Sequence, residues 1–296
     1  MEHLPAPRWW RSLIAILHGL ADYRQFPRPR PSILPAAPAP SPIAEPPIPA
    51  WAPIGLDALT APPGAGEVHV YLASLDEPPL PGNELRSTLE ASEIERAARF
   101  HFEVHRRRFI HGRGLLRQVL GRVLDVPPAS LRFETGAAGK PRLASPFSNR
   151  PPHLDFNLSH SADLALVALS DGAAIGADIE APRAVPELAA IARQNFAPSE
   201  RACLESLPVE LQADAFLACW TRKEAFVKAL GGGLSIALDS FEVSLDPRAP
   251  AALLACADPD HPCKAFTLAA LRTPPGAWSA IVVRRANALV RTFSLR

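Results

Sequence analysis

Two acidic residues, one position apart, are the first side chains in this sequence that could bind a metal ion. Asp178 and Glu180 lie in the stretch Gly-Ala-Asp-Ile-Glu, which begins at residue 176. Alternate residues of a β-strand project from the same face, so a strand here would place both carboxylates side by side. Neighbouring carboxylates repel each other unless a cation lies between them, and oxygen ligands suit Mg²⁺. A solvated strand edge is the alternative explanation of the pair.

A second group of charged residues lies in Trp-Thr-Arg-Lys-Glu-Ala-Phe-Val-Lys, residues 220–228. At helical spacing Trp220, Glu224 and Lys228 share one face, with Lys223 beside them. Glu224 could therefore complete a metal site, while the lysine ammonium groups bind phosphate oxygens. The alternative is an ordinary Glu–Lys pair on an exposed helix, which contributes only about 0.2–0.5 kcal/mol.

Two further polar stretches precede these carboxylates. Residues 156–161, Phe-Asn-Leu-Ser-His-Ser, are expected to form the end of an apolar strand that runs into a polar turn. The Gly-x-Ser-x-Gly elbow of hydrolases is absent, and adjacent Ser159 and His160 rarely orient as nucleophile and base, so side-chain donors to a phosphate fit better. Lys140 lies in Gly-Lys-Pro, expected in a hairpin; the short spacing and Pro141 exclude a P-loop.

Arginine dominates the basic residues. Of the 31 Lys and Arg residues only four are lysine, and three of these lie in or beside the stretches described above. A cluster of arginines belongs to an expected helix over residues 92–124, for which a solvated face is the default explanation and a nucleotide carrying several phosphates the functional one. The cluster consists of Arg96, Arg99, Arg106, Arg107, Arg108 and Arg113.

The elements that must position these side chains follow from hydrophobic spacing. Strands are predicted over 68–72, 131–134, 154–158, 164–169, 174–179, 241–245, 266–271, 278–283 and 289–293. Helices are predicted over 92–124, with Ser87 or Ser92 as its cap, and over 185–195, 199–207 and 211–230, the last stopped by three glycines. Each half thus contains strands around a major helix, which indicates an α+β fold of two similar subdomains.

The first part of the chain differs from the rest in composition. A short amphipathic helix is expected near the N-terminus, where the apolar run is too short for a membrane span and unlike a signal peptide. Proline recurs densely over residues 27–63, which indicates a polyproline-like or disordered tether, so ordered structure is expected to begin near Glu67. This leader could be a tether, a ligand for a partner, or the product of a misassigned start.

Composition bounds the class of protein. The 296 residues are 48% hydrophobic, enough for a sizeable core, and the net charge of +1 argues against a protein built mainly for nucleic acid. The four cysteines form no Cys-x-x-Cys pair, so neither a disulfide scaffold nor a zinc site is expected. A reduced, cytoplasmic protein that does not enter the membrane is the simplest interpretation.

The four stretches occur in a fixed order, and their starts lie 17, 20 and 44 residues apart. Together they resemble the 4'-phosphopantetheinyl transferase superfamily, in its longer two-subdomain form that serves polyketide and non-ribosomal peptide synthetases. The resemblance covers residues 68–296. It implies an α+β fold of two subdomains related by a pseudo-twofold axis, over 67–173 and 174–296, with the metal site in the second and residues 1–66 as a leader.

The resemblance also implies roles for the residues that match. Mg²⁺ would be held by Asp178, Glu180 and Glu224, and Lys228 would contact the coenzyme A pyrophosphate and assist the leaving group. The nucleotide and its 3'-phosphate would be contacted by Lys140, Ser159 and His160, with further phosphate contacts from Arg96 and Arg108. Glu93 stands where some relatives have a basic residue, and Phe109 where some have a small polar one. Glu200 matches an acidic position near the site to which no role is assigned.

The implied reaction moves 4'-phosphopantetheine from coenzyme A to a serine of an acyl or peptidyl carrier protein and releases adenosine 3',5'-bisphosphate. Either Glu224 or a metal-bound water would take the serine proton. The expected partners are the carrier and coenzyme A, without nucleic acid or membrane, and the expected state is a monomer. A metal-dependent phosphohydrolase acting on a nucleotide and a coenzyme A-binding module without catalysis are the two other classes left open.

Overall fold

The structure is a computed structural model of the 296-residue chain. It describes residues 51–136, 139–149, 151–185, 187–273 and 276–296. The expected N-terminal helix and most of the proline-rich stretch lie outside the described residues. The residues from 45 to 296 form one compact unit. Within the described ranges, no helix is both long and apolar enough to cross a membrane.

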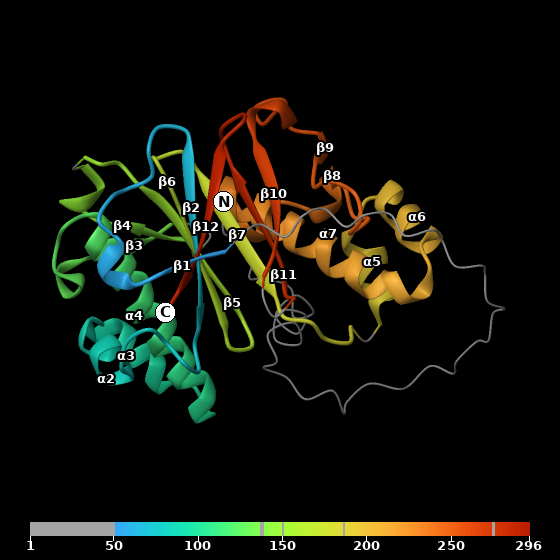
Figure 1. Cartoon of the computed structure of the whole chain (residues 1–296). Coiled ribbons are helices and arrows are strands. Elements are labelled where there is room, and N and C mark those ends of the chain that lie inside the picture. Colours follow the sequence, from blue (N-terminus) through green and yellow to red (C-terminus); the bar gives the residue numbers. More distant parts are fainter. Residues whose placement is uncertain (1–50, 137–138, 150, 186, 274–275) are drawn as a thin grey trace. The chain divides into compact units, whose positions relative to one another are not determined.

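Two β-sheets account for most of the strands (Figure 1). The first has the order β1-β12-β2-β6-β5 and the second the order β10-β11-β7. The strands of the first sheet are β1 (Ala52–Ile54), β12 (Leu289–Leu295), β2 (Glu67–Ser74), β6 (Leu164–Ser170) and β5 (Asp155–Ser161). Those of the second are β10 (Thr267–Arg272), β11 (Trp278–Val283) and β7 (Ile175–Glu180), all antiparallel.

Helices and short hairpins complete the described chain. The α-helices are α2 (Gly82–Ser87), α3 (Ala91–Ala98), α4 (Glu103–Val123), α5 (Leu188–Asn195), α6 (Pro198–Ser206) and α7 (Val209–Leu230). The hairpins are β3 (Phe133–Thr135) with β4 (Pro141–Leu143) and β8 (Phe241–Val243) with β9 (Leu253–Cys256). Short 3₁₀ turns lie at η2 (Leu56–Ala58), η3 (Pro128–Ser130), η4 (Phe147–Asn149), η5 (Gly233–Ser235), η6 (Leu238–Ser240) and η7 (Cys263–Ala265).

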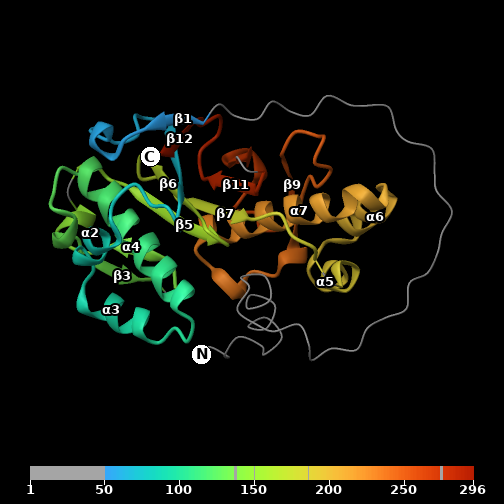
Figure 2. The same cartoon turned by 60° about the horizontal axis from the view of Figure 1, so that its bottom comes forward.

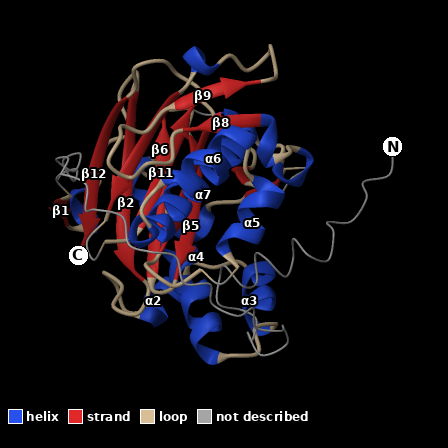
Figure 3. Ribbon diagram, turned by 90° about the vertical axis from the view of Figure 1, so that its right-hand side faces the viewer, coloured by secondary structure: helices blue, strands red, loops and turns tan. Residues whose placement is uncertain are grey.

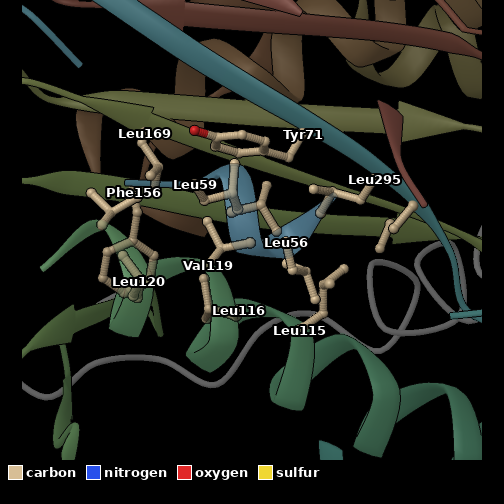
Figure 4. Packing of buried hydrophobic residues seen from close by; sticks show 14 of the residues in the cluster. Leu56, Leu59, Tyr71, Leu115, Leu116, Val119, Leu120, Phe156, Leu169 and Leu295 are labelled. Carbon is tan, nitrogen blue, oxygen red and sulfur yellow. The ribbon is translucent and has the colours of Figure 1, made fainter. Parts of the chain in front are cut away.

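The first core lies between α4 and the first sheet (Figure 4). Leu115, Leu116, Val119 and Leu120 recur at helical spacing and are almost fully buried. Each such side chain contributes about 1.5–3 kcal/mol when it is removed from water. Their partners include Leu56, Leu59, Tyr71, Phe156, Leu169 and Leu295. This stripe confirms the apolar face predicted for the arginine-rich region.

The second core lies between the two sheets. It joins apolar residues of β2 and β6 to Ile175, Ala177 and Ile179 of β7 and to residues of β10 and β11. Because strand residues alternate, the other face of β7 carries Gly176, Asp178 and Glu180. That face meets α7, which runs beside β7 (Figure 2). The long helix on each sheet agrees with the expected α+β plan of two similar halves.

The single helix predicted over residues 92–124 is wrong, because the chain breaks between α3 and α4. Phe102 has an extended backbone and immediately precedes α4, while Phe100 packs on Phe109 with ring centroids 5.4 Å apart. A bend in the chain between α3 and α4, not a continuous helix, therefore brings Phe100 against Phe109. The predicted caps also differ: Ser87 ends α2, Ser92 lies inside α3, and the Glu93 carboxylate accepts the Glu90 backbone N–H instead.

Ordered structure begins earlier than the expected start near Glu67. Strand β1 pairs in parallel with β12 at the edge of the first sheet (Figure 3), and Leu56 and Leu59 are buried in the first core. Trp51 donates its indole N–H to the Arg272 carbonyl. Residues 51–59 therefore belong to the folded unit. Strand β12, from the end of the chain, also lies in the first sheet, so the sheets do not follow the boundary predicted at residue 174.

Candidate active site

A close approach between β7 and α7 forms the floor of the site. A Cβ atom placed on Gly176 would lie 2.0 Å from the Ala225 carbonyl oxygen and 2.4 Å from the Ala229 nitrogen. Only glycine can occupy this position without moving the helix. The first residue of Gly-Ala-Asp-Ile-Glu thus brings the strand with the acid pair against the helix turn that carries Glu224 and Lys228.

The acid pair of β7 is buried on the α7 face. Asp178 and Glu180 are 2% and 1% exposed, so the expected strand geometry is confirmed but the solvated-edge alternative is wrong. Ser159 donates its hydroxyl to Asp178 Oδ1 at 3.0 Å, and Ser161 donates to Glu180 Oε2 at 2.9 Å. Arg183 reaches the same Glu180 oxygen at 3.3 Å.

Helix α7 contributes a carboxylate and an ammonium group to the same site. The Nζ of Lys228 lies 2.6 Å from Asp178 Oδ1 and 3.3 Å from Ser159 Oγ, and the lysine side chain remains 28% exposed. Glu224, one turn earlier, is half-buried. The shared helix face predicted for Glu224 and Lys228 is consistent with this arrangement, and both side chains interact electrostatically with Asp178.

The charges of this cluster are poorly compensated. Burial, reinforced by repulsion from Asp178, raises the pKa of Glu180 to about 8 and that of Glu224 to about 7, although Lys228 opposes both changes. Burial alone would lower the pKa of Lys228, yet the attraction of Asp178 and Glu224 raises it. The site therefore holds more negative charge than its own cations neutralise.

These residues fit a hard divalent cation. Asp178 Oδ2 and Glu224 Oε1 are buried oxygens without a hydrogen-bond partner, which is costly unless a positive charge approaches them. Carboxylate oxygens are the ligands that Mg²⁺ prefers. Across the part of the chain that the structure describes, no three acidic, histidine or cysteine residues are already arranged as a metal-binding group. In this site the Lys228 ammonium group lies against Asp178 instead.

The polar residues of Phe-Asn-Leu-Ser-His-Ser lie within strand β5, so the expected polar turn is wrong. The side chains of Asn157, Ser159 and Ser161 point from one face and are each 4% exposed. Asn157 Oδ1 accepts the Ala177 N–H at 3.0 Å, so this face hydrogen-bonds along β7 and joins the edges of the two sheets. His160 follows Ser159 in the strand and therefore projects from the opposite face, which carries Phe156 in the first core, but His160 itself is exposed.

Lys140 lies near the other end of β7. Its Nζ donates to Asp155 Oδ2 at 2.6 Å and to the Ile175 carbonyl at 2.7 Å, and the same carboxylate oxygen accepts the Ile175 N–H. Burial lowers the pKa of Lys140 against the attraction of Asp155. This lysine anchors the first residue of β7 to the start of β5, whereas Asp178 and Glu180 lie at the end of β7.

The arginine cluster is mostly committed to ion pairs. Arg107 and Arg108 bind Asp76, which lowers the pKa of that carboxyl to about 2, and Arg113 binds Glu93 at 2.6 Å. Arg96 stacks over the Phe109 ring, with its guanidinium carbon 5.3 Å from the centroid. Neither Arg96 nor Arg108 has a recorded contact with the carboxylate cluster among the described residues.

Lys223 does not take part in phosphate binding, contrary to expectation. Its side chain is 0% exposed, and its Nζ lies 2.8 Å from Glu200 Oε2 and 2.7 Å from the carbonyls of Leu238 and Phe241. Glu200 also accepts the N–H groups of Val243 and Ala197. Glu200, which had no assigned role from sequence, is therefore the buried partner of Lys223, and the pair links α7 to α6 and β8.

Comparison with known proteins agrees with this architecture. A family model described as the 4'-phosphopantetheinyl transferase superfamily matches residues 174–279, and one described as 4'-phosphopantetheinyl transferase, N-terminal, matches residues 83–171. The chain is 42% identical over 187 residues to the 4'-phosphopantetheinyl transferase HetI of Nostoc sp., covering 63% of this chain and 78% of that protein.

Two other relatives are more distant. The 4'-phosphopantetheinyl transferase of Bacillus subtilis is 32% identical over 180 residues, 60% of this chain and 77% of its own length. The human L-aminoadipate-semialdehyde dehydrogenase-phosphopantetheinyl transferase is 32% identical over 166 residues, 54% of each chain. On its sequence and its two-part architecture, the chain belongs to the 4'-phosphopantetheinyl transferase superfamily.

Proposed function

We propose that the protein transfers 4'-phosphopantetheine from coenzyme A to a serine of an apo acyl or peptidyl carrier protein. The carrier hydroxyl forms a new bond to the β-phosphorus, and the bond to adenosine 3',5'-bisphosphate breaks, in an in-line displacement. Membership of the family supports this reaction. The observation that carries it is the cluster of three carboxylates and Lys228 between β7 and α7, with two buried carboxylate oxygens lacking partners.

Mg²⁺ is proposed to be held by Asp178, Glu180 and Glu224, where it would neutralise pyrophosphate charge. The raised pKa values of Glu180 and Glu224 support a site that needs an added cation. The hydroxyls of Ser159 and Ser161 donate to the two β7 carboxylates and so hold their orientation.

Lys228 is the proposed contact to the pyrophosphate. Its side chain is 28% exposed, against 3% for that of Asp178. If a cation neutralised the carboxylates, the Lys228 ammonium group, which now lies 2.6 Å from Asp178 Oδ1, would be able to donate to a phosphate oxygen. A positive charge there stabilises the departing bisphosphate as negative charge builds on it.

Glu224 is the proposed base for the serine proton. In the metal-free site its pKa of about 7 is near the range in which a general base works at neutral pH. Its side chain is half-buried on α7, and if the metal ion takes the unpartnered Oε1, a water molecule held by the ion would be the alternative base.

The adenosine end of coenzyme A is proposed to contact Arg96, Arg108, Lys140, Ser159 and His160. In the structure Arg108 binds Asp76, Lys140 binds Asp155 and Ser159 binds Asp178. A phosphate that binds these groups must therefore compete with the carboxylates already present. His160 is exposed near the end of β5, on the face opposite Ser159, and Arg96 lies over Phe109.

We also propose a pathway, a cellular state and a division of the chain into subdomains. The carrier serves polyketide or non-ribosomal peptide synthesis, and the enzyme acts as a cytoplasmic monomer without nucleic acid. The two subdomains divide near residue 174, apart from strand β12, which lies in the first sheet, and the leader ends before Trp51 rather than at residue 66.

The test is a transfer assay with purified protein, coenzyme A, Mg²⁺ and several apo-carrier proteins. We expect each competent carrier to gain the mass of one phosphopantetheine and adenosine 3',5'-bisphosphate to accumulate in equal amount. Asp178→Asn keeps the size of the side chain and the hydrogen bond from Ser159 but removes the charge, so it should abolish transfer.

Two outcomes would replace the proposal with another function. Release of phosphopantetheine without any acceptor protein would indicate a phosphohydrolase. Tight binding of coenzyme A without turnover for any carrier would indicate a binding module. The carrier mass and the free products separate these outcomes in one experiment.

A further inference from the structure

Cys256 and Cys263 lie far closer together than the sequence suggests. Cys256 ends β9, Cys263 begins η7, and their sulfur atoms are 2.8 Å apart. The Cys263 thiol donates a hydrogen bond to the Cys256 sulfur, so the two sulfur atoms are in direct contact. Both cysteines are in the reduced form and half-buried, which leaves them accessible to a small reagent.

The loop between the two cysteines is held in place without them. The Asp258 carboxylate accepts a hydrogen bond from the Asp260 backbone N–H at 2.9 Å and lies 2.7 Å from the His261 Nδ1. The backbone N–H of His261 donates to the Asp258 carbonyl. Pro259 and Pro262 further restrict the backbone. The reduced chain therefore already holds the two sulfur atoms close together before any bond joins them.

We propose that Cys256 and Cys263 are a redox-sensitive modification site that forms an intramolecular disulfide with a low-molecular-weight disulfide as oxidant. One thiolate attacks the oxidant and releases one small thiol, giving a mixed disulfide. The neighbouring thiolate then attacks this intermediate and releases the second small thiol. The protein loses two protons and two electrons, and the oxidant gains them.

The position of the pair determines what the bond would constrain. Cys256 faces Phe241 across the β8–β9 hairpin, and Phe266 follows Cys263 by three residues. Both rings pack on Phe226 of α7, at centroid distances of 4.7 and 5.2 Å. The disulfide would thus join the two segments that support this part of α7. Because the sulfurs are already adjacent, it should stabilise the fold without displacing Glu224.

The experiment incubates the full chain with a glutathione redox buffer, stops exchange with acid and maps the peptides without reduction. Trypsin cuts after Arg248 and Lys264, so both cysteines fall in one peptide. We expect this peptide to become lighter by two hydrogen atoms, and the oxidised chain to melt at a higher temperature than the reduced chain.

The variant Cys263→Ser is the matched control. It should keep one glutathione on Cys256 and show no rise in melting temperature from intramolecular bonding. Half-buried Cys203, outside the pair, reports general thiol oxidation in the same digest. A wild-type peptide that stays reduced, or that carries glutathione without losing two hydrogens, would overturn the proposal. So would a disulfide that forms but leaves the melting temperature unchanged or lowers it.

Discussion

The metal-free protein should lose stability as the pH rises through neutrality, because buried carboxyls in the site must ionise. The pKa of Glu180 is raised from 4.5 to about 8 and that of Glu224 from 4.5 to about 7. In the unfolded chain both groups release their protons near pH 4.5. Above that pH the folded state binds more protons than the unfolded state, so the free energy of unfolding falls until the pH passes the folded pKa values.

The size of the effect follows from the pKa values. At about 1.4 kcal/mol for each pKa unit, the rise for Glu180 corresponds to about 5 kcal/mol and that for Glu224 to about 3 kcal/mol. Each of these groups titrates together with a neighbouring ionisable group, so the two values are not additive. We expect a loss of up to about 5 kcal/mol for the pair between about pH 4.5 and pH 8.5.

The assay is urea unfolding with a chelator, from about pH 5.5 to about pH 8.5, for the wild type and Glu224→Gln. The variant should lose less stability over this range, because one ionising group is gone. Added Mg²⁺ should stabilise the wild type more at the upper end, where the carboxylates are charged. An equal pH dependence for the two proteins, or the same Mg²⁺ effect at both ends, would mean that ionisation of these buried carboxyls does not control stability in this pH range.

Three further predictions test the packing around the site. Gly176→Ala should lower the free energy of unfolding by about 3 kcal/mol or more, because its Cβ would collide with α7, whereas Gly55→Ala, with open space around it, should change it by less than about 0.5 kcal/mol. Ser161→Ala should weaken Mg²⁺ binding about tenfold in calorimetry, and Ser161→Thr should recover it; equal affinities would contradict the positioning role. Deleting residues 1–50 should leave the melting temperature unchanged, but deletion through residue 63, which removes Leu56, should lower it; equal effects would contradict the early start of the fold.

The sequence predicts which acidic side chains share a face because the side-chain period of a strand or a helix depends only on local backbone geometry. Asp178 and Glu180 share a face of β7 for that reason, and the same holds for Glu224 and Lys228 on α7. Spacing does not tell which side of a helix is buried. Lys223, adjacent to Glu224, is therefore assigned to phosphate from sequence, although it is fully enclosed in the structure.

The residues that sequence reasoning missed act across long separations. The role of Gly176 depends on a helix some fifty residues later, and that of Ser161 on the edge of another sheet. The alternation of Asn157, Ser159 and Ser161 is the one available signal, since three small polar residues at period two suggest a polar face on a buried strand. Leu56 and Leu59 also pack against residues far along the chain, and the prolines around them favour a disordered tether in the sequence prediction.

Binding of Mg²⁺ by Asp178, Glu180 and Glu224 together is the basis of the proposed transfer reaction. Calorimetric titration of Mg²⁺ into the full chain, with and without coenzyme A, tests it directly. We predict one ion per chain for the wild type and a loss of binding in Asp178→Asn and in Glu224→Gln, while both variants keep the unfolding midpoint of a folded protein. Undiminished Mg²⁺ binding in either folded variant would contradict the account.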